Sequence, residues 1–143
     1  MAAHQLVIVI PAFNEAATIA DQVYQLMVLG DVLVVNDGSD DDTKAICLGL
    51  PCQLINLSPN QGYDAALEAG IKWCCANDQN YDYVITTDAD GQIPFISVER
   101  AYRELVSGAE CVIGVRRVLA RYGERIVGIV THLKYRVPDI FCG

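Results

Sequence analysis

The sequence predicts an α/β fold in which a mainly parallel sheet is covered by helices on both faces. Short apolar runs alternate with helical patterns, and each run is apolar at consecutive positions, as in strands that are buried on both faces. The 143 residues are 52% hydrophobic, which suits one compact domain over residues 1–143. The longest apolar run, residues 6–13, is far shorter than the roughly 20 residues that cross a bilayer.

The predicted elements follow one another regularly. Leu6–Ile10 is expected to be a buried strand, and residues 15–29 a helix with Ile19, Val23, Leu26 and Met27 on one face. Further strands are predicted at 31–35, 53–57, 83–87 and 111–115, and further helices at 43–48, 63–75 and 94–106. Ser39 precedes three aspartates and is the expected cap of the helix at 43–48.

Charge is distributed unevenly along the chain. Residues 1–99 carry two basic and fourteen acidic side chains, a net −12, whereas residues 100–143 carry eight basic and four acidic ones, a net +4. The acidic part suits metal and nucleobase binding, and it argues against a nucleic-acid partner. Basic residues of the last part could face an acceptor phosphate or an anionic membrane surface, namely Arg121, Arg125, Lys134 and Arg136. The simpler interpretation of Arg100, Arg103 and Lys134 is as solvated helix charges.

The cysteine pattern favours a reducing cellular compartment. The six cysteines form no CxxC pair, and most have apolar sequence neighbours, which predicts reduced thiols (Cys47, Cys52, Cys74, Cys75, Cys111 and Cys142). The N-terminus lacks the basic region of a signal peptide. We therefore expect a cytoplasmic protein, with the cytoplasmic face of a membrane as a second location.

Polar groups follow every predicted strand. In parallel α/β sheets, ligands bind beyond the carboxyl ends of the strands. The residues after the five predicted strands are 11–15, 36–39, 58–62, 88–92 and 116–117, and they include carboxylates, glycines and arginines. The sequence thus predicts one ligand-binding site, at the carboxyl edge of the sheet.

Asp88-Ala89-Asp90 is the strongest single motif at this edge. Two carboxylates one residue apart can bind a hard cation, which can hold a diphosphate. An EF-hand calcium loop would require acids at the positions of Thr86 and Ser97, so it fails. A phosphatase of the haloacid-dehalogenase type would use Asp88 as nucleophile and Asp90 as acid/base. Strands precede the motif here and Gln92 replaces the usual Thr, which disfavours that alternative.

Asp37-Gly38 is compatible with a hairpin turn or with a strand-to-helix turn. The acidic and then helical residues that follow favour the second, in which Asp37 offers its carboxylate to a ring N–H of a nucleobase. Phe13, just past a strand, could stack on that base or belong to the core. Glu15 by itself is typical of a helix start, and Asn60-x-Gly62 is a weak loop signal.

Five segments together resemble the family 2 inverting glycosyltransferases, which have the GT-A fold. They are Val9–Glu15, Val34–Ser39, Asn60–Gly62 with Ala65–Ala66, Asp88–Gln92 and Gly114–Arg116. The Asp-Ala-Asp-x-Gln and Gly-x-Arg patterns are most similar to the dolichyl- and polyprenyl-phosphate glycosyltransferase branch. The resemblance implies a Rossmann-like three-layer α/β/α sandwich that covers essentially the whole chain.

The resemblance also implies roles for individual residues. Residues implied in nucleotide-sugar binding are Pro11, Phe13, Glu15, Val35, Asp37, Asp88, Ala89 and Arg116. Asp88, Asp90 and Gln92 would surround a Mg²⁺ or Mn²⁺ that bridges the donor diphosphate, and Asp90 and Arg116 would be catalytic. Arg116 would pair with phosphate oxygens, for which its fork geometry is suited.

The implied activity is sugar transfer, with inversion, from a UDP- or GDP-sugar to a polyprenyl or dolichyl phosphate, or to a saccharide hydroxyl. Two alternatives stay open: a nucleotide-sugar-binding fragment that is catalytically impaired, and the Asp88 phosphatase. In the family, a segment resembling Val137–Gly143 leads into further elements on the acceptor side, so we expect a chain truncated at its C-terminus. Asn36, Asp64 and Gly91 depart from the pattern, and Gly91 is expected to loosen the metal loop.

Overall fold

The computed structural model describes residues 5–76 and 80–114. The chain divides into two compact units, residues 1–109 and 110–143. All the described helices and strands belong to the first unit, whereas residues 110–114 of the second form neither. The single domain expected over residues 1–143 therefore stays a prediction.

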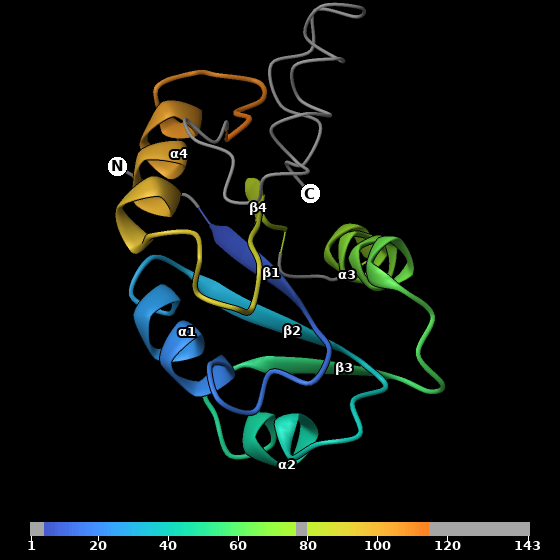
Figure 1. The fold of residues 1–143 in the computed structure, drawn as a ribbon. Helices are drawn as coiled ribbons and strands as arrows, with labels where there is room; N and C mark the ends of the chain where they lie inside the picture. The colour runs from blue at the N-terminus through green and yellow to red at the C-terminus, as the bar shows by residue number, and fades with distance from the viewer. Residues whose placement is uncertain (1–4, 77–79, 115–143) are drawn as a thin grey trace, which may run out of the picture. The chain divides into compact units, whose positions relative to one another are not determined.

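Four parallel strands form the sheet of the first unit, in the order β3-β2-β1-β4 (Figure 1). The strands are β1 (Leu6–Ala12), β2 (Asp31–Asp37), β3 (Gln53–Leu57) and β4 (Tyr83–Thr86). The helices are α1 (Ile19–Leu26), α2 (Thr43–Cys47), α3 (Tyr63–Ala76) and α4 (Phe95–Val106). The parallel α/β architecture is confirmed, and the hairpin at Asp37-Gly38 is excluded because β2 and β3 run in parallel on either side of α2.

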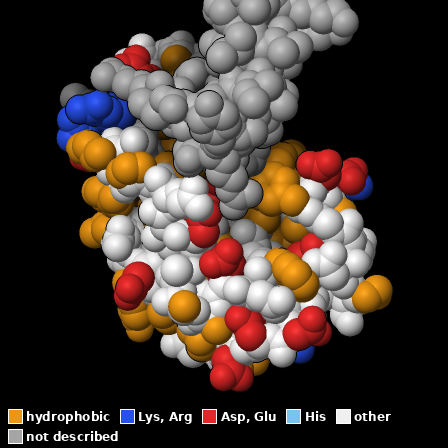
Figure 2. Space-filling model, in the orientation of Figure 1, with side chains coloured by type: hydrophobic (Ala, Val, Ile, Leu, Met, Phe, Trp, Pro, Cys, Tyr) orange, Lys and Arg blue, Asp and Glu red, His pale blue; other side chains and the backbone are white. Residues whose placement is uncertain are grey.

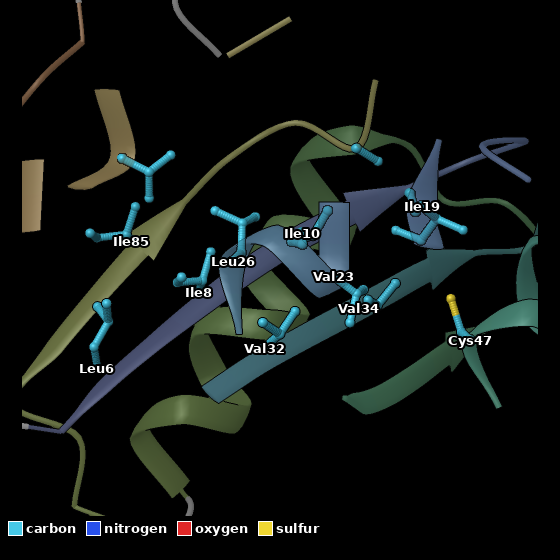
Figure 3. Packing of buried hydrophobic residues seen from close by; sticks show 13 residues of the cluster. Leu6, Ile8, Ile10, Ile19, Val23, Leu26, Val32, Val34, Cys47 and Ile85 are labelled. Carbon is cyan, nitrogen blue, oxygen red and sulfur yellow. The ribbon is translucent and has the colours of Figure 1, made fainter. Parts of the chain in front are cut away.

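The core lies on both faces of β1, whose seven residues are all buried. On one face Leu6, Ile8 and Ile10 pack with residues of α1, α2 and α4 (Figure 3). On the other face Val7 and Val9 pack against α3. Full burial of each such side chain contributes roughly 1.5–3 kcal/mol to the free energy of folding, so β1 contributes strongly to the stability of the sheet.

Helix α3 approaches the sheet closely at Gly70. A Cβ added there would lie 2.5 Å from Cγ1 of Val9 and 3.1 Å from Cγ2 of Val35. Only a residue without a side chain leaves room for those two valines. This close contact places the first turn of α3 beside the carboxyl edge of the sheet.

One predicted helix start and one predicted helix cap are wrong, whereas α2 begins at Thr43 as predicted. Helix α1 begins at Ile19 rather than at residue 15, because residues 16–18 form a turn. It ends at Leu26, so Met27 lies beyond it and is 42% exposed. Helix α2 begins after Asp42, so Ser39 does not cap it; the Ser39 hydroxyl instead accepts a hydrogen bond from the N–H of Asn14.

The predicted fifth strand is also not seen. Its described residues, 111–114, form no strand, and Val112 and Ile113 are 36% and 73% exposed. A strand needs a neighbour for its backbone hydrogen bonds, which an apolar run alone does not supply. Val115 lies outside the described residues.

Two further expectations concern membranes and thiols. No helix in the described part of the chain is long and apolar enough to cross a membrane. The five cysteines that the structure describes are free, as predicted, and Cys47 and Cys74 are buried. Burial raises the pKa of the Cys47 thiol to about 11, so this thiol is protonated near neutral pH. Cys142 lies outside the described residues.

Candidate functional site

A pocket of about 310 Å³ lies at the carboxyl edge of the sheet. It is lined by Pro11, Ala12, Phe13, Glu15, Asp37, Asn60, Gly62, Tyr63, Ala66, Asp88, Ala89 and Asp90. Seven residues predicted from the sequence thus come together in one place. A larger hollow of about 430 Å³ lies at the amino edge, beside Asp31, Trp73 and Tyr81, and none of the predicted site residues lines it.

The pocket is acidic. Glu15, Asp37, Asp88 and Asp90 line it, and no lysine or arginine is among its described lining residues. Phe13 is 44% exposed and offers an aromatic face to the same space. In Figure 2 the acidic side chains are spread across the described part of the visible face, whereas the basic ones lie at its margins. An anionic ligand therefore needs a cation, or basic groups from elsewhere, to bind here.

Asp37, at the end of β2, holds the loop between β3 and α3. Its Oδ1 accepts the N–H of Gln61 at 2.8 Å, and its Oδ2 accepts the N–H of Gly62 at 2.8 Å. Its carbonyl accepts Nδ2 of Asn60 at 3.0 Å. The Asp37 side chain is 3% exposed, so both carboxylate oxygens are already engaged where a nucleobase contact was predicted. The structure thus gives Asp37 a second role, in shaping the pocket wall.

Gly38, the residue after Asp37, allows two loops to approach each other closely. Gly38 has φ +68°, a left-handed conformation that glycine adopts without strain. A Cβ at Gly38 would lie 2.7 Å from the backbone nitrogen of Asn60. Glycine here lets the β2–α2 loop touch the β3–α3 loop.

Side chains of the β2–α2 loop fix the β1–α1 loop. Backbone N–H groups of Asn14, Glu15 and Ala16 donate to Ser39 Oγ, Thr43 Oγ1 and Asp41 Oδ2 at 2.9, 2.8 and 3.1 Å. Asn14 is in the left-handed region (φ 57°), which asparagine tolerates better than most residues. These bonds hold Phe13 and Glu15 at the pocket.

The Asp41 carboxylate is part of the same network. A hydrogen bond from the Thr43 hydroxyl is the main reason why the pKa of Asp41 lies below its usual value. The Asp41 carboxylate thus joins the β1–α1 loop to the β2–α2 loop by accepting the backbone N–H groups of Ala16 and Thr43.

The Asp88–Asp90 segment follows β4. The Tyr63 hydroxyl, at the start of α3, donates to Oδ1 of Asp88 at 3.2 Å. The backbone N–H of Gln92 donates to Oδ1 of Asp90 at 2.9 Å. Burial, followed by the charge of Asp88, raises the pKa of Tyr63 to about 12, so the hydroxyl is a hydrogen-bond donor near neutral pH.

Gly91 suits the turn in which it lies. Its φ is +75°, and a Cβ would lie 3.0 Å from Nε2 of Gln22 on α1. The departure from the family pattern at this position therefore accompanies a left-handed turn that favours glycine.

Two predicted site residues that the structure describes do not line this pocket. Val35 is fully buried in the core beneath α3, and Gln92 is exposed without lining the pocket. Arg116, like the basic residues after it, lies outside the described residues.

The residue that the sequence analysis missed is Tyr63. The sequence predicts it only as the start of a helix, although it directly follows Gly62 at the carboxyl edge of the sheet. Its place at that edge, one residue after a loop glycine, was the signal available.

The pocket fits a divalent cation that is shared with a ligand. Carboxylate oxygens such as those of Asp88 and Asp90 are suitable ligands for Mg²⁺ and Mn²⁺. Within residues 5–76 and 80–114, however, no three His, Cys, Asp or Glu side chains are grouped to hold a metal. Magnesium is commonly held by one or two carboxylates together with substrate phosphates, and this pocket offers that arrangement.

A parallel α/β sheet with an acidic pocket at its carboxyl edge is compatible with a nucleotide-sugar transferase of the GT-A type. Residues 7–126 match the family model for Glycosyl transferase family 2, and the chain belongs to that family.

Named relatives agree with this assignment. The chain is 35% identical over 115 residues to an uncharacterized protein of Methanocaldococcus jannaschii. This alignment covers 78% of this chain and 46% of the relative. It is 28% identical over 146 residues to an uncharacterized glycosyltransferase of Mycobacterium tuberculosis, which covers 96% of this chain and 64% of the relative. The chain thus spans between about half and two thirds of the length of these relatives.

Solved structures show the same fold. Glucosyl-3-phosphoglycerate synthase from Mycobacterium tuberculosis in complex with UDP is 21% identical, with a TM-score of 0.70 over 92% of this chain and 50% of that one. The same enzyme has been solved with Mn²⁺, UDP and glucosyl-3-phosphoglycerate, at a TM-score of 0.59 over 75% and 41% of the two chains. The GT-A fold predicted from the sequence is therefore confirmed.

Proposed function

We propose that this chain forms the donor side of a metal-dependent inverting glycosyltransferase that uses a UDP- or GDP-sugar. The observation that carries the proposal is the meeting of Phe13, Glu15, Asp37, Asp88 and Asp90 in one pocket. Family membership and a similar fold that binds UDP and Mn²⁺ support it.

The charge of the pocket supports metal dependence. Four carboxylates would repel a diphosphate, so the donor needs a counter-charge on binding. Asp88 and Asp90, with Gln92 beside them, would hold Mg²⁺ or Mn²⁺ at the donor diphosphate. Such a cation would neutralise the charge that grows on the departing nucleoside diphosphate.

The remaining roles belong to residues of this chain. Phe13 would stack on the base, with Pro11, Glu15, Asp37 and Ala89 completing the nucleotide side. Arg116 would pair with the phosphate oxygens and stabilise the leaving group. An acceptor oxygen bonds to the anomeric carbon from the face opposite the diphosphate. The bond to the diphosphate oxygen breaks, and its electron pair leaves with the nucleotide. One displacement of this kind inverts the anomeric configuration.

We propose a polyprenyl or dolichyl phosphate as the acceptor, with a saccharide hydroxyl as the alternative. The Asp-Ala-Asp-x-Gln and Gly-x-Arg patterns support the lipid phosphate. A phosphate oxygen is already ionised, so it needs no general base, whereas a hydroxyl needs one. The basic residues after position 100 would bring the protein to the cytoplasmic face of the membrane.

Calorimetric titration of UDP and GDP, with Mn²⁺ and then with EDTA, tests the donor site. We expect binding of one nucleotide that EDTA abolishes. Asp88→Asn should weaken it on the order of 100-fold, about 2.7 kcal/mol, because a charged ligand is lost. Asp40→Asn is the matched control, since it removes the same charge from an exposed side chain outside the pocket.

The alternatives give different results. Absence of nucleotide binding by the folded protein would overturn the donor site. Donor binding without transfer to any lipid phosphate or saccharide would identify a catalytically impaired binding module. An aspartyl-phosphate trapped on Asp88 would establish the phosphatase instead.

A further inference from the structure

Tyr63 links the part of the pocket that follows β3 to the part that follows β4. It is the first residue of α3 and comes after the loop that leaves β3, which is one of the two outer strands of the sheet. Its hydroxyl donates a hydrogen bond to Asp88, which follows β4, the outer strand on the other side. Tyr63 therefore spans the carboxyl end of β1, and its side chain lines the pocket.

The backbone on both sides of Tyr63 is held in place. Asp37 accepts the N–H of Gln61 and of Gly62, the residue immediately before Tyr63, both at 2.8 Å. From the other end, Gly70 packs α3 against Val9 and Val35. The backbone that carries the hydroxyl is therefore held by a buried carboxylate and by a close helix–sheet contact, so the hydroxyl meets Asp88 in a defined place.

We propose that Tyr63 is a positioning residue of the donor site, and that its hydroxyl holds one oxygen of Asp88 so that the carboxylate is aimed at the metal and diphosphate. This inference rests on the proposed function. Groups that orient the ligands of a metal in this way typically change metal affinity 10- to 100-fold when they are removed.

The chain contains a matched control for this contact. The Tyr81 hydroxyl donates to Oδ2 of Asp31 at 2.9 Å, at the amino edge of the sheet and outside the pocket. Tyr63→Phe and Tyr81→Phe remove the same atom and the same kind of hydrogen bond. Only the first should affect donor binding.

The test measures the affinity of Mn²⁺ with UDP, and with GDP, for the whole protein and its variants. Tyr63→Phe should weaken nucleotide binding in the presence of Mn²⁺ by about tenfold. Tyr81→Phe should leave it within about twofold. In an Asp88→Ala background, Tyr63→Phe should add less than about twofold, because the two residues act through one contact. Tyr63→Leu, as a second variant, should weaken binding at least as much as Tyr63→Phe.

Each other result overturns the inference in a recognisable way. If the wild-type protein binds nucleotide and Tyr63→Phe binds equally well, Tyr63 does not position Asp88, while the proposed function stands. If Tyr63→Phe loses as much affinity in the Asp88→Ala background as in the wild type, the hydroxyl does not act through Asp88. An equal loss in Tyr81→Phe would indicate a general effect on folding. A wild-type protein that binds neither nucleotide removes the proposed function and this inference with it.

Discussion

The two edges of the sheet are built differently, although the same four strands form both. At the carboxyl edge, side chains such as Asp37, Ser39 and Thr43 accept backbone N–H groups of neighbouring loops. At the amino edge, Gly30 lies against the backbone of Leu6, and Trp73 and Tyr81 stack at a centroid distance of 6.4 Å. Side-chain bonds to backbone N–H groups dominate the carboxyl edge, whereas the amino edge combines close packing with a few polar contacts, such as that from Tyr81 to Asp31.

This difference separates binding from stability. Loops that are tied by hydrogen bonds present four carboxylates to the pocket at the carboxyl edge, whereas the hollow at the amino edge contains none of the predicted site residues. We therefore expect substitutions at the carboxyl edge to change donor binding, and substitutions at the amino edge to change stability alone.

The largest effect is expected for Asp37→Ala. Two N–H groups lose a charged acceptor, and at about 1.5 kcal/mol for each bond the variant should lose about 3 kcal/mol of unfolding free energy. Donor binding should also weaken, because the loop that carries Tyr63 is released. Urea unfolding followed by nucleotide titration of the folded fraction measures both.

Two variants sharpen this result. Asp37→Asn keeps one acceptor oxygen and should lose about half as much stability. Asp40→Ala removes a neighbouring exposed carboxylate and should lose almost none. If Asp37→Ala lost nucleotide binding at unchanged stability, the carboxylate would serve the ligand rather than the loop.

The difference between the edges also explains what could be predicted from the sequence. Runs such as Leu6–Ile10 and Asp31–Val35 show their burial in their composition, so the four observed strands and their parallel direction could be predicted, whereas the apolar run at 111–114 forms no strand. Because the ends of parallel strands meet at one edge, Asp37 and Asp88 could also be placed together.

The contacts inside the site could not be predicted in this way. Glu15 and Thr43, or Tyr63 and Asp88, are far apart in the sequence and leave no periodic pattern. Their bonds depend on where the folded loops meet. Helix α1 likewise begins later than the acid at Glu15 predicts, at Ile19, after a turn at residues 16–18.

An intermediate effect is expected at the amino edge for Gly30→Ala. The new Cβ would lie 2.5 Å from the carbonyl oxygen of Leu6, which is backbone and cannot easily move aside. Overpacking of this kind should lower the unfolding free energy by about 2 kcal/mol. Nucleotide binding by the folded protein should not change.

Gly49→Ala is the control for that variant. A Cβ at Gly49 would meet its nearest neighbour, the carbonyl oxygen of Ile46, at 3.5 Å, an ordinary contact distance. Stability should therefore be nearly unchanged. Weakened nucleotide binding in folded Gly30→Ala would contradict the separation of the two edges.

The smallest effect is expected for Gly91→Ala, at the carboxyl edge. Alanine at φ +75° costs about 1 kcal/mol, and the flexible end of Gln22 can move away from the added Cβ at 3.0 Å. Gly108→Ala also imposes backbone strain, at φ +106°, where a Cβ meets nothing within 4 Å. Because this φ lies further from the left-handed region than that of Gly91, Gly108→Ala should lose at least as much stability in thermal unfolding. Only Gly91→Ala should weaken nucleotide binding, by about twofold, because Asp90 and Gln92 flank it.

Tighter nucleotide binding by Gly91→Ala would instead mean that the native glycine loosens the metal loop, as its departure from the family pattern suggests.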